Sequence, residues 1–399
     1  MCDSHDHVPA ADECRGVPVS EAVGMILAHD ITEIRPGDFK GRAFKKGHVV
    51  RQEDIDHLKR LGKEHLSLVR IADDEMHEDD AAHALAVALM GEGVRIQGEP
   101  KEGKINIIAD RDGLLRIDRE ALLAFNMLGE VMCATMHSNS RVKKGQIVAG
   151  TRAIPLVIKK NIVGEAVRIA KEVRSSEFGV RSETANPQSA IRNPRSWCGV
   201  IEVKELRKPK TGVVITGNEV YHGRIKDAFA PVISRKIEEY GGEMVGIYYA
   251  PDDKRYIEDR LRELLHAGAD LLITTGGMSV DPDDVTRFAI RNLGATDVAY
   301  GSAVLPGAMV LVGYIETRDE RQETMNNEEI LGSRHSSLVP ILGIPACGMY
   351  HKTTVFDLVL PRVLAGERVG RRELAELGHG GLCLNCPECR YPVCPFGKD

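Results

Sequence analysis

The sequence lacks any long hydrophobic run and any excess of positive charge. Its 399 residues carry a net charge of −6, so a basic nucleic-acid-binding surface is not expected for the chain as a whole. The longest apolar runs, such as residues 84–90, are far shorter than the roughly 20 residues that span a bilayer. No basic start followed by an apolar stretch opens the chain, so no signal peptide is expected. These absences favour a cytoplasmic protein that binds neither nucleic acid nor a membrane.

Cysteine is sparse until the end of the chain. Five of the nine cysteines are scattered singly, and the other four gather at Cys383, Cys386, Cys389 and Cys394. A disulfide framework in a secreted protein would distribute its pairs along the chain. One terminal cluster in a long chain is typical of metal ligation, which fits the expected cytoplasmic location.

Hydrophobic patterning divides the chain into six segments. Hydrophobic residues make up 43% of the sequence and charged residues 28%, as in an ordinary globular protein. We expect a flexible tail at 1–15, an N-terminal segment at 16–72, a β-rich domain at 73–173, a linker at 174–205, an α/β domain at 206–370 and a cysteine-rich tail at 371–399.

The N-terminal segment carries two helical signals. One covers residues 19–28, and the other covers 52–62, where apolar residues recur near helical spacing before Gly62. The first part of the chain is therefore expected to be helical.

The next segment begins with a helix-like stretch at 81–90, after which the hydrophobic pattern changes. In residues 91–169 short apolar runs alternate with glycine-rich breaks, which predicts a small barrel or sandwich with one helix at 119–128. Residues 174–194 are poor in large apolar side chains and end in Asn-Pro, which predicts a linker.

Residues 210–366 predict a parallel sheet with helices on both faces, a three-layer α/β/α fold. Apolar runs typical of buried strands lie at 212–216, 244–249, 270–274, 309–314 and 338–344. Helical patterns at 229–240 and 257–265 lie between the first three runs. Short buried strands alternating with helices indicate a parallel sheet covered on both faces. The polar stretch 316–337 predicts an exposed loop or a disordered insertion.

Three loops of this sheet have the composition of a ligand site. In an open parallel sheet, ligands bind beyond the carboxyl ends of the strands, which predicts a site at 216–227, 274–285 and 343–353. The middle loop, TTGGMSVDPDDV, combines hydroxyls with two glycines, and its Asp281 is suited to cap the next helix. Backbone N–H groups at such a turn form a concave site for an anion.

Acidic side chains follow the same strands, at Glu219, Asp227, Asp252, Asp281, Asp283 and Asp284. A divalent ion such as Mg²⁺ would allow carboxylates to lie beside a phosphate group. For Asp252, Asp281 and Asp283 helix capping or a solvated surface is the simpler interpretation. Glu219 follows a strand and a glycine turn, which favours a functional role.

The order of these motifs resembles the molybdopterin-binding domain. TGNE at 216–219, TTGGMSVDPDD at 274–284, PGA at 306–308 and GIPACG at 343–348 follow the order found in molybdopterin adenylyltransferases and molybdopterin molybdenumtransferases. VPVSEAVGMILAHDI at 17–31 and, more loosely, 49–62 resemble the opening of the molybdenumtransferase family. The resemblance covers 17–71 and 210–366.

The resemblance implies binding of molybdopterin in molybdenum cofactor biosynthesis, with Mg²⁺-dependent insertion of molybdate or tungstate into adenylylated molybdopterin. It implies roles in catalysis for Glu219, Asp227 and Asp284. It implies ligand binding by Thr216, Gly217, Thr275, Gly276, Gly277, Ser279, Pro306, Gly307 and Gly343. The partners that it implies are molybdate, a molybdoenzyme or another cofactor-biosynthesis protein, and a second copy of the chain in a homodimer.

Several departures from that family keep alternatives open. Asn218 stands where the family has Asp, residues 305–309 lack both lysines of the KPGKP stretch, and no MDGYA-like stretch or C-terminal barrel is found. A non-catalytic pterin-binding carrier or sensor is therefore an alternative to a molybdenumtransferase. A third interpretation is a nucleotide pyrophosphatase, because the domain also resembles that of the competence-damage family.

The last segment places its cysteines in the order C-x2-C-x2-C-x4-C-P, at Cys383, Cys386, Cys389 and Cys394. Four thiolates at this spacing suit tetrahedral Zn²⁺. They also suit an iron–sulfur cluster, although the run is one residue longer than the ferredoxin type. The simplest alternative is a reduced tail with unbound thiols.

Overall fold

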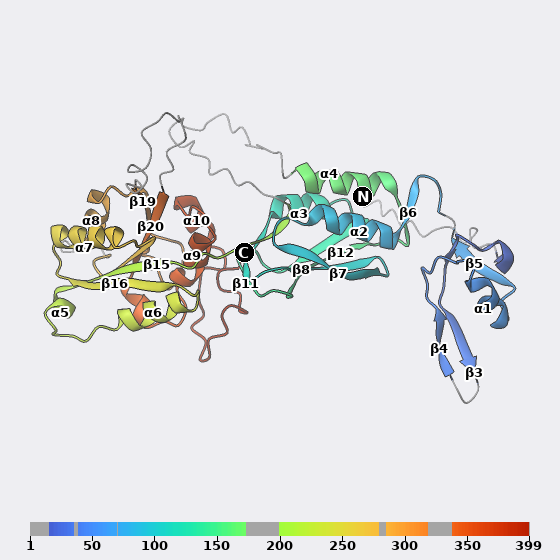
Figure 1. Ribbon diagram of the computed structural model, residues 1–399, viewed down its shortest axis with the longest axis horizontal. Helices are drawn as coiled ribbons and strands as arrows, with labels where there is room; N and C mark the ends of the chain where they lie inside the picture. The colour runs from blue at the N-terminus through green and yellow to red at the C-terminus, as the bar shows by residue number, and fades with distance from the viewer. Residues whose placement is uncertain are drawn as a thin grey trace, which may run out of the picture.

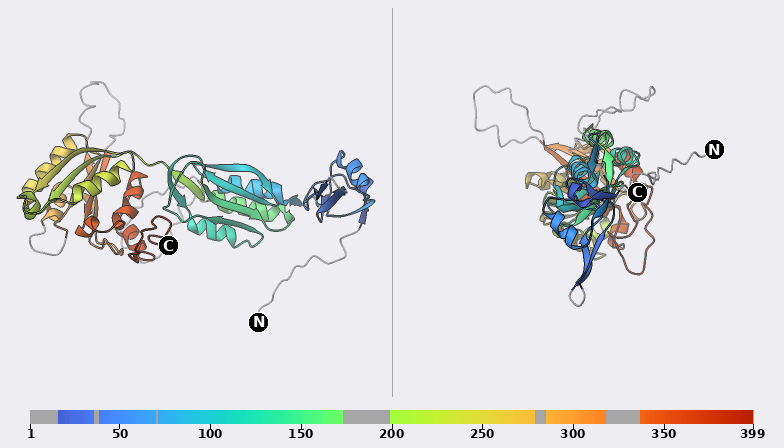
Figure 2. Two further views of the ribbon diagram at one scale, coloured as in Figure 1. Left: turned by 90° about the horizontal axis from the view of Figure 1, so that it is seen from below. Right: turned by 90° about the vertical axis from the view of Figure 1, so that its right-hand side faces the viewer.

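The computed structural model describes residues 16–35, 39–69, 71–172, 199–278, 285–317 and 337–398. These residues form three units in a row along an elongated molecule, with the N-terminal unit at one end and the α/β unit at the other (Figure 1; Figure 2). Within the described ranges no helix is long and apolar enough to cross a membrane. The tail expected at 1–15 and most of the expected linker lie outside the described residues.

The N-terminal unit is mostly β-structure. Its elements are β1 (Gly16–Pro18), η1 (Val19–Glu21), β2 (Ile26–Leu27), β3 (Ile31–Arg35), β4 (Phe39–Phe44), α1 (Asp54–Arg60) and β5 (His65–Val69). The helix expected at 52–62 is confirmed as α1. The helical prediction at 19–28 is wrong, because η1 is a single 3-10 turn and Gly24 has a φ of +81°, which a helix cannot continue through.

The middle unit is rich in β-structure, as expected, but three helices pack with its sheets. Its elements are β6 (Glu75–His77), α2 (Glu78–Leu89), β7 (Val94–Lys101), β8 (Lys104–Ala109), β9 (Gly113–Ile117), α3 (Arg119–Asn126), β10 (Val131–Thr135), β11 (Arg141–Val142), β12 (Ile147–Ala153), β13 (Val157–Lys159), α4 (Lys160–Glu172) and β14 (Ile201–Lys204). The strand orders are β10-β12-β8-β7, β11-β9-β14 and β13-β6, all antiparallel.

Two features of this unit differ from the prediction. Helix α4 was not expected, because its β-branched Ile162 and Val163 follow the apolar residues of the strand-like β13 after only the polar residues 159–161. Strand β14 lies inside the expected linker, where Ile201 pairs with Ile117 of β9 and is fully buried. Strand β14, which follows residues 173–198 in the sequence, therefore forms the edge strand of the β11-β9-β14 sheet of the middle unit.

The C-terminal unit contains a six-stranded sheet. Its strands are β15 (Lys210–Thr216), β16 (Glu243–Ala250), β17 (Leu271–Thr275), β18 (Thr296–Tyr300), β19 (Leu311–Thr317) and β20 (Ser337–Ile344). Its helices are α5 (Asn218–Tyr221), α6 (Phe229–Glu238), α7 (Lys254–His266), α8 (Thr286–Asn292), η4 (Ala346–Met349), α9 (Val355–Leu364) and α10 (Arg371–Glu376). All five predicted strands are present, with their ends shifted by a few residues.

The strand order is β16-β15-β17-β20-β19-β18, and the first four strands are parallel. Strand β19 is antiparallel to both its neighbours, and β18 was not predicted. Residues 301–310 join β18 to β19 without a helix, and a connection of that kind suits an antiparallel pair, since a parallel pair needs a crossover. The sheet is therefore largely, but not wholly, parallel.

Successive side chains of the central strand β15 pack on opposite faces of the sheet. Val213 and Ile215 belong to the core beneath α6 and α9, whereas Val214 belongs to the core beneath α7 and α8. The C-terminal unit is thus the three-layer α/β/α structure that the sequence predicts. Figure 1 shows these helices on either side of the sheet.

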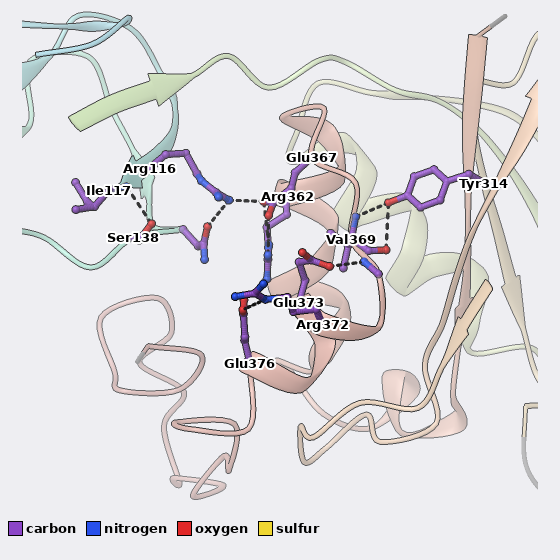
Figure 3. Close-up of polar contacts among 12 residues, drawn as sticks. Arg116, Ile117, Ser138, Tyr314, Arg362, Glu367, Val369, Arg372, Glu373 and Glu376 are labelled. Atoms are coloured by element: carbon purple, nitrogen blue, oxygen red, sulfur yellow. Dashed lines mark hydrogen bonds and ion pairs between the residues drawn. The ribbon is translucent and has the colours of Figure 1, made fainter. Parts of the chain in front are cut away.

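A buried polar network joins the middle unit to the C-terminal unit. Arg116 of β9 reaches across to the carboxylate of Glu367, which also accepts a hydrogen bond from Arg362 at 2.7 Å (Figure 3). The Arg116 and Glu367 side chains are only 11% and 13% exposed. Burial acts to raise the pKa of Glu367, but the two guanidinium groups outweigh it and hold that pKa below its ordinary value.

The C-terminal tail also contacts the middle unit. Lys398 donates a hydrogen bond to the hydroxyl of Ser140 at 3.1 Å. A second contact between the two units does not involve the tail: the Arg141 guanidinium lies 4.2 Å from the centre of the Tyr240 ring, just after α6. The cavity between the two units measures about 20 Å³, which suits a water molecule but is too small for a pterin. The interface therefore joins the two units and has no room for a ligand of that size.

Candidate functional site

The parallel strands of the C-terminal unit end together at one edge of the sheet. Thr216 at the end of β15 pairs with Ala250 at the end of β16, and Thr275 of β17 pairs with Ile344 of β20. The antiparallel β19 begins at the same edge, where Leu311 pairs with Gly343. The loops with the expected ligand residues therefore emerge side by side, as the parallel arrangement predicts. We call this edge the strand-end site.

Three threonines form the floor of the strand-end site. The hydroxyl of Thr216 donates to the backbone carbonyl of Thr275 at 2.7 Å and lies 3.2 Å from the hydroxyl of Thr286. All three side chains are buried. The Thr275 hydroxyl is also buried, yet has no hydrogen-bond partner in the structure as described. A buried hydroxyl without a partner is costly and is suited to a polar group of a ligand.

Gly276 and Gly277 cross directly over these threonines. Their φ angles are +76° and +56°, in the left-handed region that favours glycine. A Cβ added at Gly276 would lie 2.4 Å from the carbonyl oxygen of Thr216, and one added at Gly277 would lie 2.3 Å from the Thr286 hydroxyl. No other residue fits at either position without moving its neighbours. Because neither glycine has a side chain, the surface of the loop at these two positions is formed by backbone atoms.

The first loop begins at Gly217, which has a φ of +137°. The Glu219 carboxylate folds back towards this glycine, so that an added Cβ would lie 3.0 Å from its Oε1. Glu219 itself is exposed, and its carboxylate is accessible to an ion or a ligand. Asn218 and Asp252 tie the first loop to the loop after β16, because each backbone N–H donates to the other's side chain, at 3.1 Å and 3.3 Å.

Asp227 caps helix α6. Its two carboxylate oxygens accept hydrogen bonds from the backbone N–H groups of Phe229 and Ala230, at 2.8 Å and 2.9 Å. The hydroxyl of Tyr249 also donates to Asp227, at 3.3 Å. Burial and the negative charge of Asp227 both raise the pKa of Tyr249. Asp227 therefore has a structural role in this conformation, and its predicted role in catalysis stays a prediction.

Pro306 and Gly307 lie against the start of helix α9. The carbonyl of Pro306 accepts from the N–H of Val355 at 3.2 Å, and a Cβ at Gly307 would lie 2.4 Å from the Val355 side chain. Gly307 has a φ of +125°. These two residues fix the loop before β19 to the last loop of the site.

Tyr300 and Met278 were not expected from the sequence to matter. The hydroxyl of Tyr300 donates to the backbone carbonyl of Met278, directly after the two glycines. The Met278 side chain fills the space over Gly343, where an added Cβ would lie 2.6 Å from its Cε. A side chain at Gly343 would therefore displace the flexible end of Met278. No sequence signal marked Tyr300, since its strand β18 is polar and was itself missed.

Ser279 and Asp284 lie outside the described residues, as do Asp281 and Asp283. The expected binding role of Ser279 and the expected catalytic role of Asp284 stay predictions.

The cysteine tail runs along the strand-end site. The N–H of Cys383 donates to the carbonyl of Leu305 at 2.8 Å, which pairs the tail with the loop that contains Pro306. The Sγ of Cys389 lies 3.3 Å from the hydroxyl of Thr353, and this hydrogen bond lowers the pKa of the Cys389 thiol. Across the described ranges no three His, Cys, Asp or Glu side chains are grouped closely enough to hold a metal ion. The expected convergence of the four cysteines is therefore not found in this conformation.

Two family matches cover separate parts of the chain. Residues 16–70 match a domain of unknown function (DUF8806). Residues 212–365 match the family described as "Probable molybdopterin binding domain". The chain carries a probable molybdopterin binding domain. This match confirms the resemblance that TGNE, TTGG and GIPACG gave for the C-terminal unit. For residues 17–71, the resemblance to the molybdenumtransferases stays a prediction.

The relatives of this chain resemble it over part of its length. A CinA-like protein of Mycobacterium avium (strain 104) is 40% identical over 89 residues, which is 21% of this chain and 20% of that protein. The chain thus matches about a fifth of the length of this curated relative.

Solved structures align with part of this chain at low similarity. The tungsten cofactor synthesizing protein MoaB from Pyrococcus furiosus is 19% identical and covers 40% of this chain and 98% of its own, with a TM-score of 0.29. The molybdopterin biosynthesis Mog protein from Mycobacterium ulcerans is 17% identical and covers 39% and 92%, with a TM-score of 0.27.

Proposed function

We propose that this protein binds molybdopterin at the strand-end site and acts in molybdenum cofactor biosynthesis. The observation that carries the proposal is the placement of Gly276 and Gly277 directly on the hydroxyls of Thr216 and Thr286. This placement leaves the backbone N–H groups of the two glycines near the surface of the loop, where they can bind a polar ligand. These groups fit the phosphate of molybdopterin, and the family match of residues 212–365 supports the same ligand.

The reaction proposed for this site is insertion of molybdate or tungstate into adenylylated molybdopterin, with release of AMP. Glu219 is exposed beside Gly217 and would supply one carboxylate to Mg²⁺. Mg²⁺ keeps several waters and needs only one or two protein carboxylates, so Glu219 with Asp227 or Asp284 would suffice. The ion would neutralise charge on the phosphates as water attacks the phosphoanhydride, so that AMP leaves, the phosphate stays on the pterin and molybdate binds to the two pterin sulfurs.

The enzymatic half of the proposal is tested by incubating the full chain with adenylylated molybdopterin, Mg²⁺ and molybdate. We expect AMP to be released, and we expect Glu219→Gln to slow the release by about 100-fold or more. Glu238→Gln, on the far end of helix α6, is the control and should leave the rate unchanged. If the wild-type protein binds molybdopterin but releases no AMP with molybdate or tungstate, this half is wrong.

A non-catalytic pterin-binding carrier or sensor is the second candidate. The capping of α6 by both oxygens of Asp227 favours it, because that carboxylate is already used by the backbone. Residues 305–309 also contain no basic side chain that would attract molybdate. Retention of a fluorescent oxidised pterin through gel filtration without turnover would support this candidate, and rapid AMP release would exclude it.

A nucleotide pyrophosphatase is the third candidate. It is favoured by the 40% identity to a CinA-like protein over 89 residues. Hydrolysis of ADP-ribose by the full chain, combined with no binding of molybdopterin, would establish this activity in place of the first proposal.

The cysteine tail is proposed to bind Zn²⁺ or an iron–sulfur cluster. The conformation described here does not group the four thiols, so metal binding would require the tail to rearrange around Pro387 and Pro392. A tail that rearranges in this way would be suited to contact a molybdoenzyme or another cofactor-biosynthesis protein. We further propose a homodimer, which light scattering tests, and a cytoplasmic location, which cell fractionation tests.

A further inference from the structure

Arg287 lies at the strand-end site, although no motif in the sequence marks it. It follows Thr286, whose hydroxyl touches both Thr216 and the backbone of Gly277. Helix α8 begins at Thr286, so Arg287 lies one residue beyond the hydroxyl that approaches the glycine loop.

The guanidinium of Arg287 is held beside the glycine loop by an aromatic ring. Its Cζ lies 4.5 Å from the centre of the Tyr300 ring, and the Tyr300 hydroxyl donates to the carbonyl of Met278. Stacking on an aromatic ring restricts an arginine side chain and leaves its N–H groups directed outward from the edge of the guanidinium. The cation is therefore placed next to the residue that follows Gly276 and Gly277.

The charge of Arg287 has no partner among the described residues. The side chain is half-buried, its Nε is buried without a hydrogen-bond partner, and none of the described carboxylates forms an ion pair with it. Arg260 and Arg368 also lie over tyrosine rings, but each is paired with a carboxylate. Arg260 contacts Glu263 at 2.6 Å, and Arg368 contacts Asp297. Arg141 also lies over a tyrosine without such a pair, but it donates to the backbone carbonyl of Glu239 at 3.4 Å, whereas no hydrogen bond or ion pair engages Arg287 among the described residues.

We infer that Arg287, together with the backbone of Gly276 and Gly277, forms a subsite for a phosphate ester. A guanidinium matches two phosphate oxygens at once, and no carboxylate of the described residues forms an ion pair with Arg287 that would compete with them. This inference rests on the proposed function for the location of the site, and it adds the residue that recognises the charged end of the ligand. The ester could come from a pterin phosphate or from a nucleotide, and the experiment separates them.

The test measures binding to the full chain by isothermal titration calorimetry with four probes. They are the phosphorylated oxidised pterin derived from molybdopterin, the same pterin after removal of phosphate, ADP-ribose and inorganic pyrophosphate. The variants are Arg287→Gln and Arg287→Lys, and the control is Arg291→Gln, an exposed arginine in the last turn of the same helix. Circular dichroism verifies that each variant is folded.

We expect Arg287→Gln to weaken binding of the phosphorylated pterin about tenfold or more, and Arg287→Lys to restore part of the loss. Binding of the dephosphorylated pterin should not depend on Arg287, and Arg291→Gln should behave as wild type. A purely structural role would weaken both pterins equally, and that result would overturn the inference. If Arg287→Gln is poorly folded, the same comparison of phosphorylated with dephosphorylated pterin is made on Arg287→Lys.

The four probes distinguish a failure of this inference from a failure of the proposed function. Binding of ADP-ribose but not of pterin, with loss in Arg287→Gln, would support the subsite and contradict the proposed function. Equal binding of phosphorylated pterin by wild type and Arg287→Gln would contradict the subsite and leave the proposed function intact. If wild type binds none of the phosphorylated probes, including pyrophosphate, the inference is wrong.

Discussion

The hydroxyl of Thr216 donates a hydrogen bond to the backbone carbonyl of Thr275, with 2.7 Å between Oγ1 and O. This contact joins the ends of two neighbouring parallel strands at the point where the chain turns into the glycine loop. The hydroxyl lies directly beneath Gly276 and Gly277, so the geometry of the strand-end site depends on this buried contact within the protein.

Replacement of Thr216 by valine tests the importance of this hydroxyl for stability. Thr216→Val keeps the shape of the side chain but leaves the Thr275 carbonyl and the Thr286 hydroxyl without this partner. We expect the free energy of unfolding to fall by about 1–2 kcal/mol. Urea denaturation followed by circular dichroism measures the change.

Thr274→Val is the matched control for that experiment. The Thr274 hydroxyl is equally buried but has no hydrogen-bond partner in the described structure. Its replacement should change the stability by no more than about 0.5 kcal/mol, or should increase it. Equal losses in the two variants would contradict a special role for the Thr216 hydroxyl.

The backbone of Gly277 is the second target. Gly277→Ala introduces a Cβ that would lie 2.3 Å from the Thr286 hydroxyl, at a φ of +56°. The strain of about 1–3 kcal/mol should displace the loop and weaken pterin binding about tenfold or more. Gly268→Ala also has a positive φ but open space around its Cβ, and it should bind the pterin normally. Fluorescence titration compares the two variants.

The interface between the middle and C-terminal units gives a third prediction. Arg116→Met removes one of the two guanidinium groups that contact the buried Glu367 carboxylate. We expect a loss of about 1–3 kcal/mol in the free energy of unfolding. Arg372→Met breaks an exposed pair with Glu376 and should cost at most about 0.5 kcal/mol. Similar losses of unfolding free energy in both variants would argue against a stabilising role for the buried Arg116–Glu367 contact between the units.

The same carboxylate predicts a dependence of stability on pH. The pKa of Glu367 lies below its ordinary value of 4.5 in the folded protein. Its stabilising effect is therefore complete above the ordinary pKa and is lost as the pH falls through the depressed folded-state pKa. We expect Glu367→Gln to differ most from wild type above pH 4.5 and to approach it in stronger acid. Glu376→Gln, at an exposed position, should follow the wild-type curve at every pH.

Metal analysis tests the cysteine tail. We expect purified protein to contain either zinc or iron with inorganic sulfide, and we expect the metal to be lost when Cys383, Cys386, Cys389 and Cys394 are all replaced by serine. Cys347→Ser, outside the tail, should retain it. A folded wild-type protein without metal after anaerobic purification would contradict the proposal and favour free thiols.

The sequence predicted the C-terminal unit well because its central strands, such as β15 and β17, are buried on both faces. Runs such as GVVIT and LLIT have no polar position that could place them at a surface, so their assignment did not depend on context. Strand β18 (TDVAY) was missed because four of its five residues are not buried, and its place at the edge of the sheet comes from pairing with β19.

The N-terminal unit was less predictable for a local reason. Residues 19–28 have helical spacing of apolar side chains, but Gly24 at a positive φ turns the chain, and Ile26 and Leu27 pair with β5. Long-range pairing of this kind leaves little trace in local spacing. The same holds for Ile201–Lys204, whose partner β9 lies more than eighty residues earlier.

At the strand-end site, the sequence identified the glycines and Thr216 but not Thr286, Arg287 or Tyr300. Glycine pairs and strand-end hydroxyls carry their own local signal. By contrast, Thr286 and Tyr300 matter only through contacts with Gly277 and Met278 that the fold creates. Residues that act through such contacts need a structure to be found.

The central claim is that a phosphorylated pterin binds to the Gly276–Gly277 loop. Its most direct test is a fluorescence titration of the full chain with the oxidised phosphorylated pterin, on wild type and on a variant that carries both Gly276→Ala and Gly277→Ala. We predict saturable binding at one site per chain in the wild type and loss of that binding in the folded double variant. Absence of saturable binding in the wild type, or equal binding by the two proteins, would contradict the account.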